Sequence, residues 1–262
     1  MPFGLKNAPG HFQRFMDSIL LYKITDDGHY IDDIIFVDIC KDKHISKIRN
    51  TLKILLENGL IVSPQKCVFF AEEIEFLGHK LAVGGKITPL DSRLAPILNY
   101  PVPKTVKQVQ SFLGFCNYYR RFLKDFSHHA IHLSNLTRKD RPFNWTSVEN
   151  NAFQFIKNSF KDCLLFTPDR SLQFVLETDA SDYALGAALH QNGKPIAFHS
   201  RKFSSSEINY PIYDKELLAI MSALQHWRHL LVSTEIPIVI HTDHKNLVYF
   251  KKPQHLNRRQ AR

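Results

Sequence analysis

The feature that most restricts the fold is an alternation of strand and helix patterns over the last ninety or so residues, from about residue 171. The segments LQFVLETDA, YALGAALHQ and KPIAFHSRK predict three strands, and Gly193-Lys194 predicts a hairpin between the second and the third. The amphipathic segment 214–231 predicts a helix, and IPIVIHTD predicts a fourth strand. This order predicts an α/β domain with a mixed sheet.

Acidic residues stand where these elements meet. Asp179 and Asp243 each follow an apolar strand within a Thr-Asp pair, and strand ends in an open α/β sheet are where reacting groups converge. On the helix, Glu216 shares one stripe with three apolar side chains, namely Ile220, Ala223 and Trp227. We therefore expect Glu216 to point toward the sheet near the helix N-terminus, where the helix dipole favours a negative charge.

Three carboxylates from two strands and one helix would repel one another and raise one another's pKa. A divalent cation removes that repulsion, and two Mg²⁺ ions roughly 4 Å apart can activate a water and stabilise the leaving oxygen of a phosphodiester. Mn²⁺ is an alternative ion. The competing interpretation is that each acid is a solvated loop or cap residue; it suffices for any one of them, whereas the three together favour a metal site.

A second acidic pair lies in HYIDDIIFV, where Asp32 and Asp33 interrupt an apolar run. Adjacent like charges in an apolar setting are unfavourable unless a partner compensates them. The segment 26–38 predicts a hairpin, with Asp27-Gly28 as a turn signal followed by an extended run over 30–37. Helical patterns flank it over 12–20 and 43–60, and short β-type runs follow at 68–70 and 74–77.

The middle of the chain, from about residue 91, is helical. A helix is predicted over 109–126, with one apolar face and a basic and aromatic remainder that holds Tyr118, Arg120, Arg121 and Lys124. A further helix is predicted over 148–165, before Pro168. Cations for phosphates and rings for sugar and base surfaces suit a nucleic-acid-binding face. A solvated helix face explains the same residues equally well on this evidence alone.

The net charge of the chain favours some classes of binding partner over others. The chain carries +9 with its fourteen histidines neutral, which favours nucleic acid or, less specifically, an anionic membrane surface. No apolar run is long enough to cross a bilayer, and the N-terminus lacks a secretory pattern. Four dispersed cysteines predict reduced thiols without a disulfide or zinc framework. We expect an intracellular protein of the cytoplasm or nucleus.

The C-terminal motifs TDASDYALGAAL, KELLAIMSALQHWRHLL and IHTDHKNL resemble the ribonuclease H domain of gypsy-type LTR retrotransposon polyproteins. The resemblance implies that Asp179, Glu216 and Asp243 are metal ligands for cutting the RNA strand of an RNA–DNA hybrid. The family uses a fourth Asp in a final strand-and-helix segment, and this chain stops at Arg262 before it. We therefore expect a ribonuclease H-like sheet without its last strand and with weakened or absent cleavage.

The resemblance continues upstream. MPFGLKNAPGHFQRFMD, which contains Gln13, is similar to the reverse-transcriptase segment beneath the templating base, and YIDD to the polymerase Tyr-x-Asp-Asp hairpin. IEFLGHKL, with Gly78 and His79, resembles the primer grip, and QVQSFLGFCNYYRRFLKDFS resembles the thumb helix. In PQKCVF, Lys66 matches a position near the nucleotide site. Arg258 and Arg259 are candidate nucleic-acid contacts or an exposed tail.

Together these likenesses predict a partial reverse-transcriptase palm over 1–90, a thumb or helical linker over 91–170 and a truncated ribonuclease H-like domain over 171–262. The family activities are RNA-directed DNA synthesis, with template-primer duplex and deoxynucleoside triphosphates as substrates, and hybrid-RNA cleavage. Asp32 and Asp33 would be catalytic, with Asp32 holding metal, but the earlier Asp that works with Asp32 in the family precedes Met1, so we expect no polymerisation. The alternatives are a catalytically inactive chain that still binds RNA–DNA duplex and an unfolded remnant without function.

Overall fold

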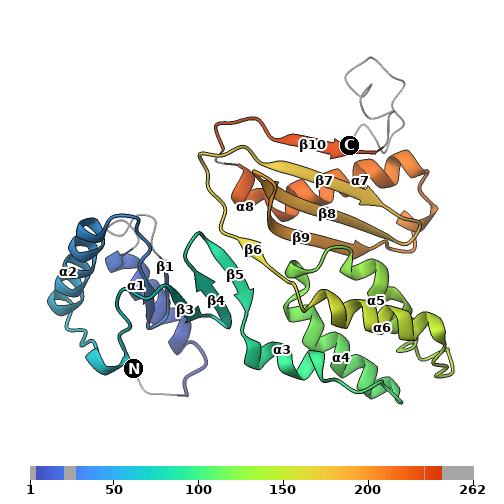
Figure 1. Ribbon diagram of the computed structural model, residues 1–262, viewed down its shortest axis with the longest axis horizontal. Coiled ribbons are helices and arrows are strands. Elements are labelled where there is room, and N and C mark those ends of the chain that lie inside the picture. The colour runs from blue at the N-terminus through green and yellow to red at the C-terminus, as the bar shows by residue number, and fades with distance from the viewer. Residues whose placement is uncertain (1–3, 21–27, 233, 244–262) are drawn as a thin grey trace. The chain divides into compact units, whose positions relative to one another are not determined.

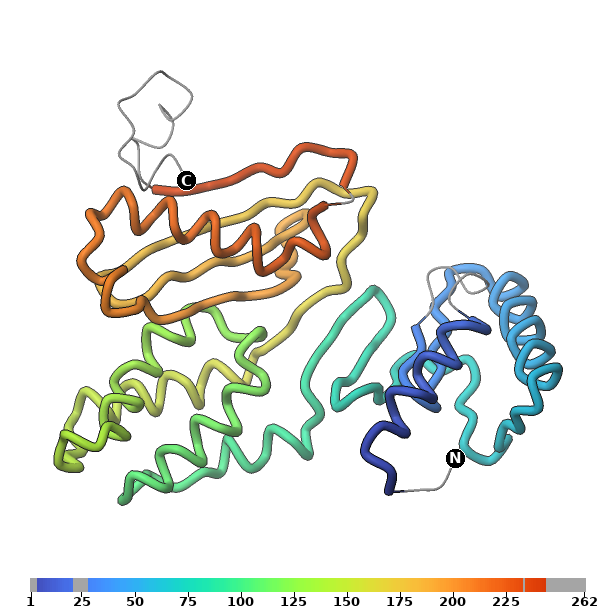
Figure 2. Tube along the Cα trace, turned by 180° about the vertical axis from the view of Figure 1, so that it is seen from behind, coloured from blue at the N-terminus to red at the C-terminus, as the bar shows by residue number. Residues whose placement is uncertain are grey.

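The structure, a computed structural model, describes residues 4–20, 28–232 and 234–243. It divides into two compact units, 1–70 and 71–262, which are described separately below (Figures 1 and 2). The predicted division at residues 90 and 170 remains a prediction. Among the helices of the described ranges, none combines the length and apolarity needed to cross a bilayer.

The first unit packs two helices around a small core. Helix α1 (Ala8–Leu20) buries Met16, Ile19 and Leu20 against Ile54 and Leu55 of helix α2 (Lys41–Glu57). The apolar spacing in both segments produces these faces, so both predicted helices are confirmed. A short 3₁₀ turn, η1 (Pro64–Lys66), follows.

A two-stranded hairpin completes this unit, and its turn differs from the prediction. Strands β1 (Gly28–Tyr30) and β2 (Asp33–Ile35) pair with Tyr30 opposite Asp33, so the tight turn is Ile31-Asp32. The extended run expected over 30–37 is therefore wrong, because a two-residue turn interrupts it. The run at 68–70 is also not a strand, because no strand of the described residues pairs with it and β propensity alone does not form one.

The second unit begins with an antiparallel sheet and a helical layer. Strands β3 (Glu73–Phe76), β4 (His79–Ala82), β5 (Lys86–Pro89) and β6 (Leu165–Phe166) pair in that order. The helices that follow β5 share a core in which Phe112, Leu133, Phe153 and Ile156 are fully buried. These helices are α3 (Asp91–Leu98), α4 (Val106–Tyr118), η2 (Arg120–Phe122), α5 (Phe126–Asn135) and α6 (Ser147–Ser159).

Two helix predictions in this layer are wrong at their C-terminal ends. The helix expected over 109–126 ends at Tyr118, and Asp125, in the left-handed region at φ +55°, starts α5 in a new direction. The helix expected over 148–165 ends at Ser159, because Leu165 and Phe166 pair with β5. Tertiary packing overrides helical periodicity in both places.

The C-terminal sheet confirms the predicted mixed architecture. Its order is β10 (Val239–Thr242), β7 (Val175–Ala180), β8 (Ala184–Gln191), β9 (Lys194–Lys202), with β10 parallel to β7 and the other pairs antiparallel. Helix α7 (Ile212–His226), between η3 (Glu207–Asn209) and the short α8 (Arg228–Leu231), lies across one face (Figure 2). Ala187 and Leu189 pack toward α7, whereas Phe198 packs toward the α4–α6 core, so helices cover both faces.

Candidate metal centre and nucleic-acid surface

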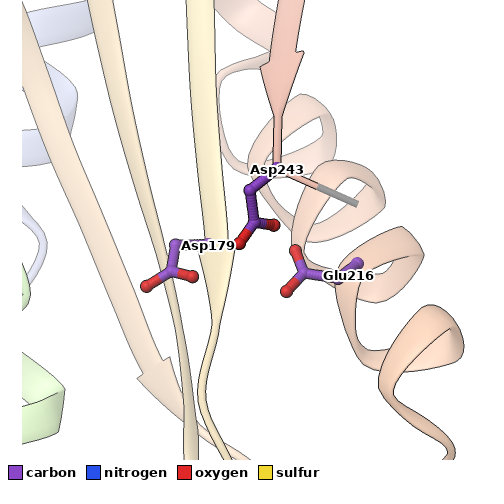
Figure 3. A group of neighbouring side chains, drawn as sticks. All are labelled: Asp179, Glu216 and Asp243. Carbon is purple, nitrogen blue, oxygen red and sulfur yellow. The ribbon is translucent and has the colours of Figure 1, made fainter. Parts of the chain in front are cut away.

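Three carboxylates gather at one end of the C-terminal sheet (Figure 3). Asp179 lies in β7 and Asp243 directly follows β10; these strands run parallel with Thr178 opposite Thr242, so the next residue of each reaches the same end. Glu216 comes from the second turn of α7. One carboxylate oxygen from each residue lies within 4.8 Å of the others. The structure thus brings together the three acidic residues that the sequence predicted to lie close to one another.

Glu216 is the buried member of this carboxylate cluster. Its side chain is only 3% exposed, and Ala223 and Trp227 on the same stripe are buried as expected. Its Oε1 accepts a hydrogen bond from the Ala180 backbone N–H at 3.2 Å, whereas its buried Oε2 has no hydrogen-bond partner among the described residues. Burial, reinforced by the charges of Asp243 and Asp179, raises the pKa of Glu216 to about 7.

This donor set suits a hard divalent cation. All three groups offer carboxylate oxygens, the ligands that Mg²⁺ and Mn²⁺ prefer, and Glu216 keeps a buried oxygen without a hydrogen-bond partner among the described residues. Asp179 and Asp243 are exposed, so the cluster opens to solvent on their side. The residues can therefore hold a metal ion that is also reached by a substrate from solution.

Two charged residues of this unit have no clear local sequence signal. A Cβ atom at Gly186, the residue opposite Asp179, would lie 2.7 Å from Asp125 Oδ1, and the Asp179 charge contributes to a raised pKa of Asp125 after burial. Lys215 is buried with its Nζ 3.6 Å from Asp182 Oδ1. Asp125 reaches the sheet only because α5 packs there, a long-range contact that local periodicity does not encode.

The polymerase-like doublet sits at the tip of the hairpin in the first unit. Asp32 is in the turn, Asp33 begins β2, and both side chains are exposed, so the expected desolvation of the pair does not arise in this structure. Ile31 has φ +56°, an unfavourable region for a β-branched residue. Its N–H donates to Gln13 Oε1 at 2.7 Å, and Gln13 Nε2 donates to Asp17 Oδ1 at 2.8 Å. Gln13 thus supports the turn from helix α1.

The primer-grip-like segment forms the β3–β4 turn. Leu77 and Gly78 occupy the left-handed region at φ +48° and +78°, and the Tyr119 hydroxyl donates to the Gly78 carbonyl at 3.2 Å. The His79 ring stacks on Tyr118 with centroids 6.3 Å apart. Burial, followed by the nearby Arg121 charge, lowers the pKa of His79 to about 4, so this histidine is neutral at pH 7.

The remaining predicted nucleic-acid residues are scattered over the surface. Arg120 and Arg121 belong to η2, Lys124 follows it, and all three are exposed together with Tyr118. Lys66 is exposed at the end of η1 in the first unit. Arg258 and Arg259 lie outside the described residues. Nucleic-acid contacts of these side chains remain predictions.

Two family models match the chain. Residues 1–81 match the reverse transcriptase (RNA-dependent DNA polymerase) model, and residues 169–262 match the RNase H-like domain found in reverse transcriptase. The second match contains the carboxylate cluster, and the first contains the hairpin doublet.

Relatives and solved structures agree with these matches. The chain is 37% identical over 261 residues to the Transposon Tf2-3 polyprotein of Schizosaccharomyces pombe, a match that covers 95% of the chain but only 19% of the polyprotein. The foamy viral protease-reverse transcriptase in complex with RNA/DNA hybrid superposes with a TM-score of 0.77 at 27% identity, over 96% of this chain and 35% of that one. The same enzyme in complex with dsDNA gives 0.79 at 27% identity, over 97% and 54%.

Proposed function

Because this chain belongs to the retrotransposon polyprotein family, of which it carries a reverse transcriptase region and an RNase H-like domain, we propose that its C-terminal domain cleaves the RNA strand of an RNA–DNA hybrid. The observation that carries the proposal is the convergence of Asp179, Glu216 and Asp243 within 4.8 Å. An uncompensated cluster of this kind is unfavourable unless a cation joins it. The substrate class follows from the family and from the positive charge of the chain.

Each of the three acids has a distinct part in this proposal. Asp179 and Asp243 would bind a divalent cation, with Mg²⁺ as the physiological ion and Mn²⁺ as a substitute. Glu216 would complete the site after losing the proton that its raised pKa retains near neutral pH, and the Ala180 N–H holds its carboxylate in place. A bound ion of this type supplies activation of a water and stabilisation of the leaving phosphodiester oxygen.

The duplex would lie on the basic and aromatic residues beside the sheet. The foamy viral structures are of complexes with RNA/DNA hybrid and with dsDNA, which supports nucleic acid as the partner class here. Exposed Tyr118, Arg120, Arg121 and Lys124 would contact sugars and phosphates, and binding would weaken steeply with salt.

A second proposed role is a contribution of the first unit to the DNA synthesis of the family, although the doublet without its partner Asp is not expected to polymerise by itself. The match to the reverse transcriptase model and the exposure of Asp32 and Asp33 at a tight, Gln13-supported turn favour it. The doublet would contribute to Mg²⁺ binding at the deoxynucleoside triphosphate. Asp32-dependent primer extension on an RNA template tests this activity separately from hybrid cleavage.

The experiment for the first proposal is cleavage of a labelled RNA–DNA hybrid with Mg²⁺. We expect Asp179→Asn to reduce cleavage at least about a hundredfold, because a neutral amide is a poor ligand for the ion. Asp140→Asn is the matched control, since Asp140 is exposed on the loop between α5 and α6 and is not part of the carboxylate cluster. Cleavage that survives Asp179→Asn refutes the proposal. Hybrid binding by wild type without any cleavage supports the inactive binding protein instead.

A further inference from the structure

A cavity of about 440 Å³ lies on the opposite face of the sheet from α7. Helices α4 and α5 and strand β9 form its walls, so it is separate from the carboxylate cluster. Its apolar surface comes from Leu113, Phe126 and Ala130. A volume in this range fits a small-molecule or nucleotide-sized ligand.

The charged residues that line the cavity are all cations. They are Arg120, Arg201 and Lys202. Glu207 neutralises one of them, because it forms a bidentate pair with the Arg201 guanidinium at 2.8 and 3.0 Å. Arg120 and Lys202 have no carboxylate within ion-pair distance among the described residues. The cavity therefore carries about two uncompensated positive charges.

Lys202 is the less solvated of these two cations. Its Nζ donates to the Ser134 hydroxyl, and burial followed by the Arg138 charge lowers its pKa. A half-buried ammonium without a counter-ion is unfavourable, and an anion that binds beside it removes that penalty. Positive potential also spreads beyond the cavity, because the Arg120 charge helps to lower the pKa of His199 and His226 after burial.

Neutral donors complete the lining. Ser127 Oγ accepts a hydrogen bond from Ser200 Oγ at 3.1 Å, which leaves the Ser127 hydroxyl proton available to an acceptor. Asn117 Oδ1 accepts a long contact of 3.4 Å from Arg120, which leaves the Asn117 amide N–H groups as donors. Cations with hydroxyl and amide donors around one cavity match an oxyanion that has several acceptor oxygens.

We propose that this cavity binds a phosphate group, with Lys202 and Arg120 as its cations and Ser127 and Asn117 as its neutral donors. The apolar wall of Leu113 and Phe126 would contact the attached sugar or base. The phosphate comes either from the backbone of a bound duplex or from a free nucleotide. The duplex form rests on the proposed function, whereas the nucleotide form does not.

The test compares the unmodified chain with Lys202→Gln and with Ser134→Asp. Gln keeps a donor toward Ser134 but removes the charge, and Ser134→Asp places a carboxylate beside an intact Lys202. Lys139→Gln is the control, because Lys139 is exposed and lies outside the cavity lining. Thermal unfolding of each variant confirms a folded protein.

Hybrid affinity is measured by fluorescence anisotropy in EDTA over a series of KCl concentrations, and calorimetry measures binding of dATP and of inorganic phosphate. If the duplex supplies the phosphate, both cavity variants bind hybrid about threefold to tenfold more weakly, and the slope of log K against log salt falls by about one for Lys202→Gln. If a free nucleotide supplies the phosphate, both cavity variants bind hybrid as tightly as wild type does but no longer bind dATP.

The proposal is overturned if both cavity variants bind hybrid, dATP and phosphate as wild type does, or if Lys139→Gln weakens binding as much as Lys202→Gln. These outcomes are distinguishable from a failure of the proposed function. A wild-type protein that cleaves no hybrid leaves the dATP and phosphate measurements intact, and those measurements then decide the cavity alone.

Discussion

Replacement of Glu216 by Gln separates the electrostatic strain of the carboxylate cluster from its packing. Gln has nearly the same shape, and its carbonyl oxygen can still accept the hydrogen bond from the Ala180 N–H. The amide can also donate toward Asp179 and Asp243, where the native Oε2 has no partner among the described residues. We therefore expect Glu216→Gln to stabilise the metal-free protein at alkaline pH.

The magnitude follows from the shifted pKa. Burial and the two aspartates raise the pKa of Glu216 from 4.5 to about 7, so the folded state favours the protonated carboxyl. The associated stability is fully present below pH 4.5 and is lost as pH rises through 7. At about 1.4 kcal/mol for each pKa unit, wild type loses about 3 kcal/mol over this range, and the Gln variant does not.

The assay is urea unfolding of both proteins in EDTA, at about pH 5 and about pH 8. The chain has two tryptophans, Trp145 and Trp227, and Trp227 is buried in the core under α7. A Trp145→Phe background therefore makes fluorescence report on the C-terminal sheet. Between the two pH values, the stability of Glu216→Gln relative to wild type should increase by about 2–3 kcal/mol.

Exposed Glu235 supplies the control, because Glu235→Gln should show no such pH dependence. Addition of Mg²⁺ near pH 8 should then stabilise wild type but not Glu216→Gln, since the ion compensates the charge that the variant lacks. A difference between wild type and Glu216→Gln that stays constant from pH 5 to pH 8 would refute the electrostatic reasoning.

Two further predictions concern hydrogen bonds. Gln13→Ala removes the acceptor for the Ile31 N–H, so hydrogen exchange of a peptide over the 30–33 turn, read by mass spectrometry, should accelerate about fivefold to tenfold. Thr146→Ala removes the N-cap of α6, where Thr146 and Glu149 form a capping box, and should lower the free energy of unfolding in urea by about 1 kcal/mol.

Neighbouring residues provide matched controls for both. Arg14→Ala changes the same helix without touching the turn, and equal acceleration in that variant would contradict the role of Gln13. Ser147→Ala changes the first residue of α6 without removing the cap, so a loss as large as that of Thr146→Ala would show that the capping box is not responsible.

The carboxylate cluster was predictable from sequence because its geometry rests on two local periodicities. The two-residue alternation of apolar side chains predicted the strands that end near Asp179 and Asp243. The 3.6-residue periodicity of a helix predicted that Glu216 shares a stripe with Ala223 and Trp227, both of which are buried. The parallel pairing of β10 with β7 then brought both strand ends together. The raised pKa of Glu216 depends on burial as well as on the neighbouring charges, so only its direction followed from the sequence.

The errors arose where a long-range contact decided a local conformation. The helix expected over 109–126 ends early because α5 is redirected onto β9, where the Ser127 N–H donates to Ser200 Oγ at 2.9 Å. Leu165 was expected to end a helix, but together with Phe166 it pairs with β5, a partner some eighty residues earlier. The hairpin turn falls at Ile31-Asp32, although Ile is disfavoured at positive φ, because Gln13 holds the Ile31 N–H from α1.

The change of chain direction before α5, which made the helix prediction over 109–126 wrong, also positions residues of the carboxylate cluster's surroundings and of the cationic cavity. It carries Asp125 to Gly186, beside Asp179, and it places Ser127 and Ser134 against Lys202. The turn at Asp125 therefore places an acid near the carboxylate cluster and begins helix α5, which lines the cationic cavity.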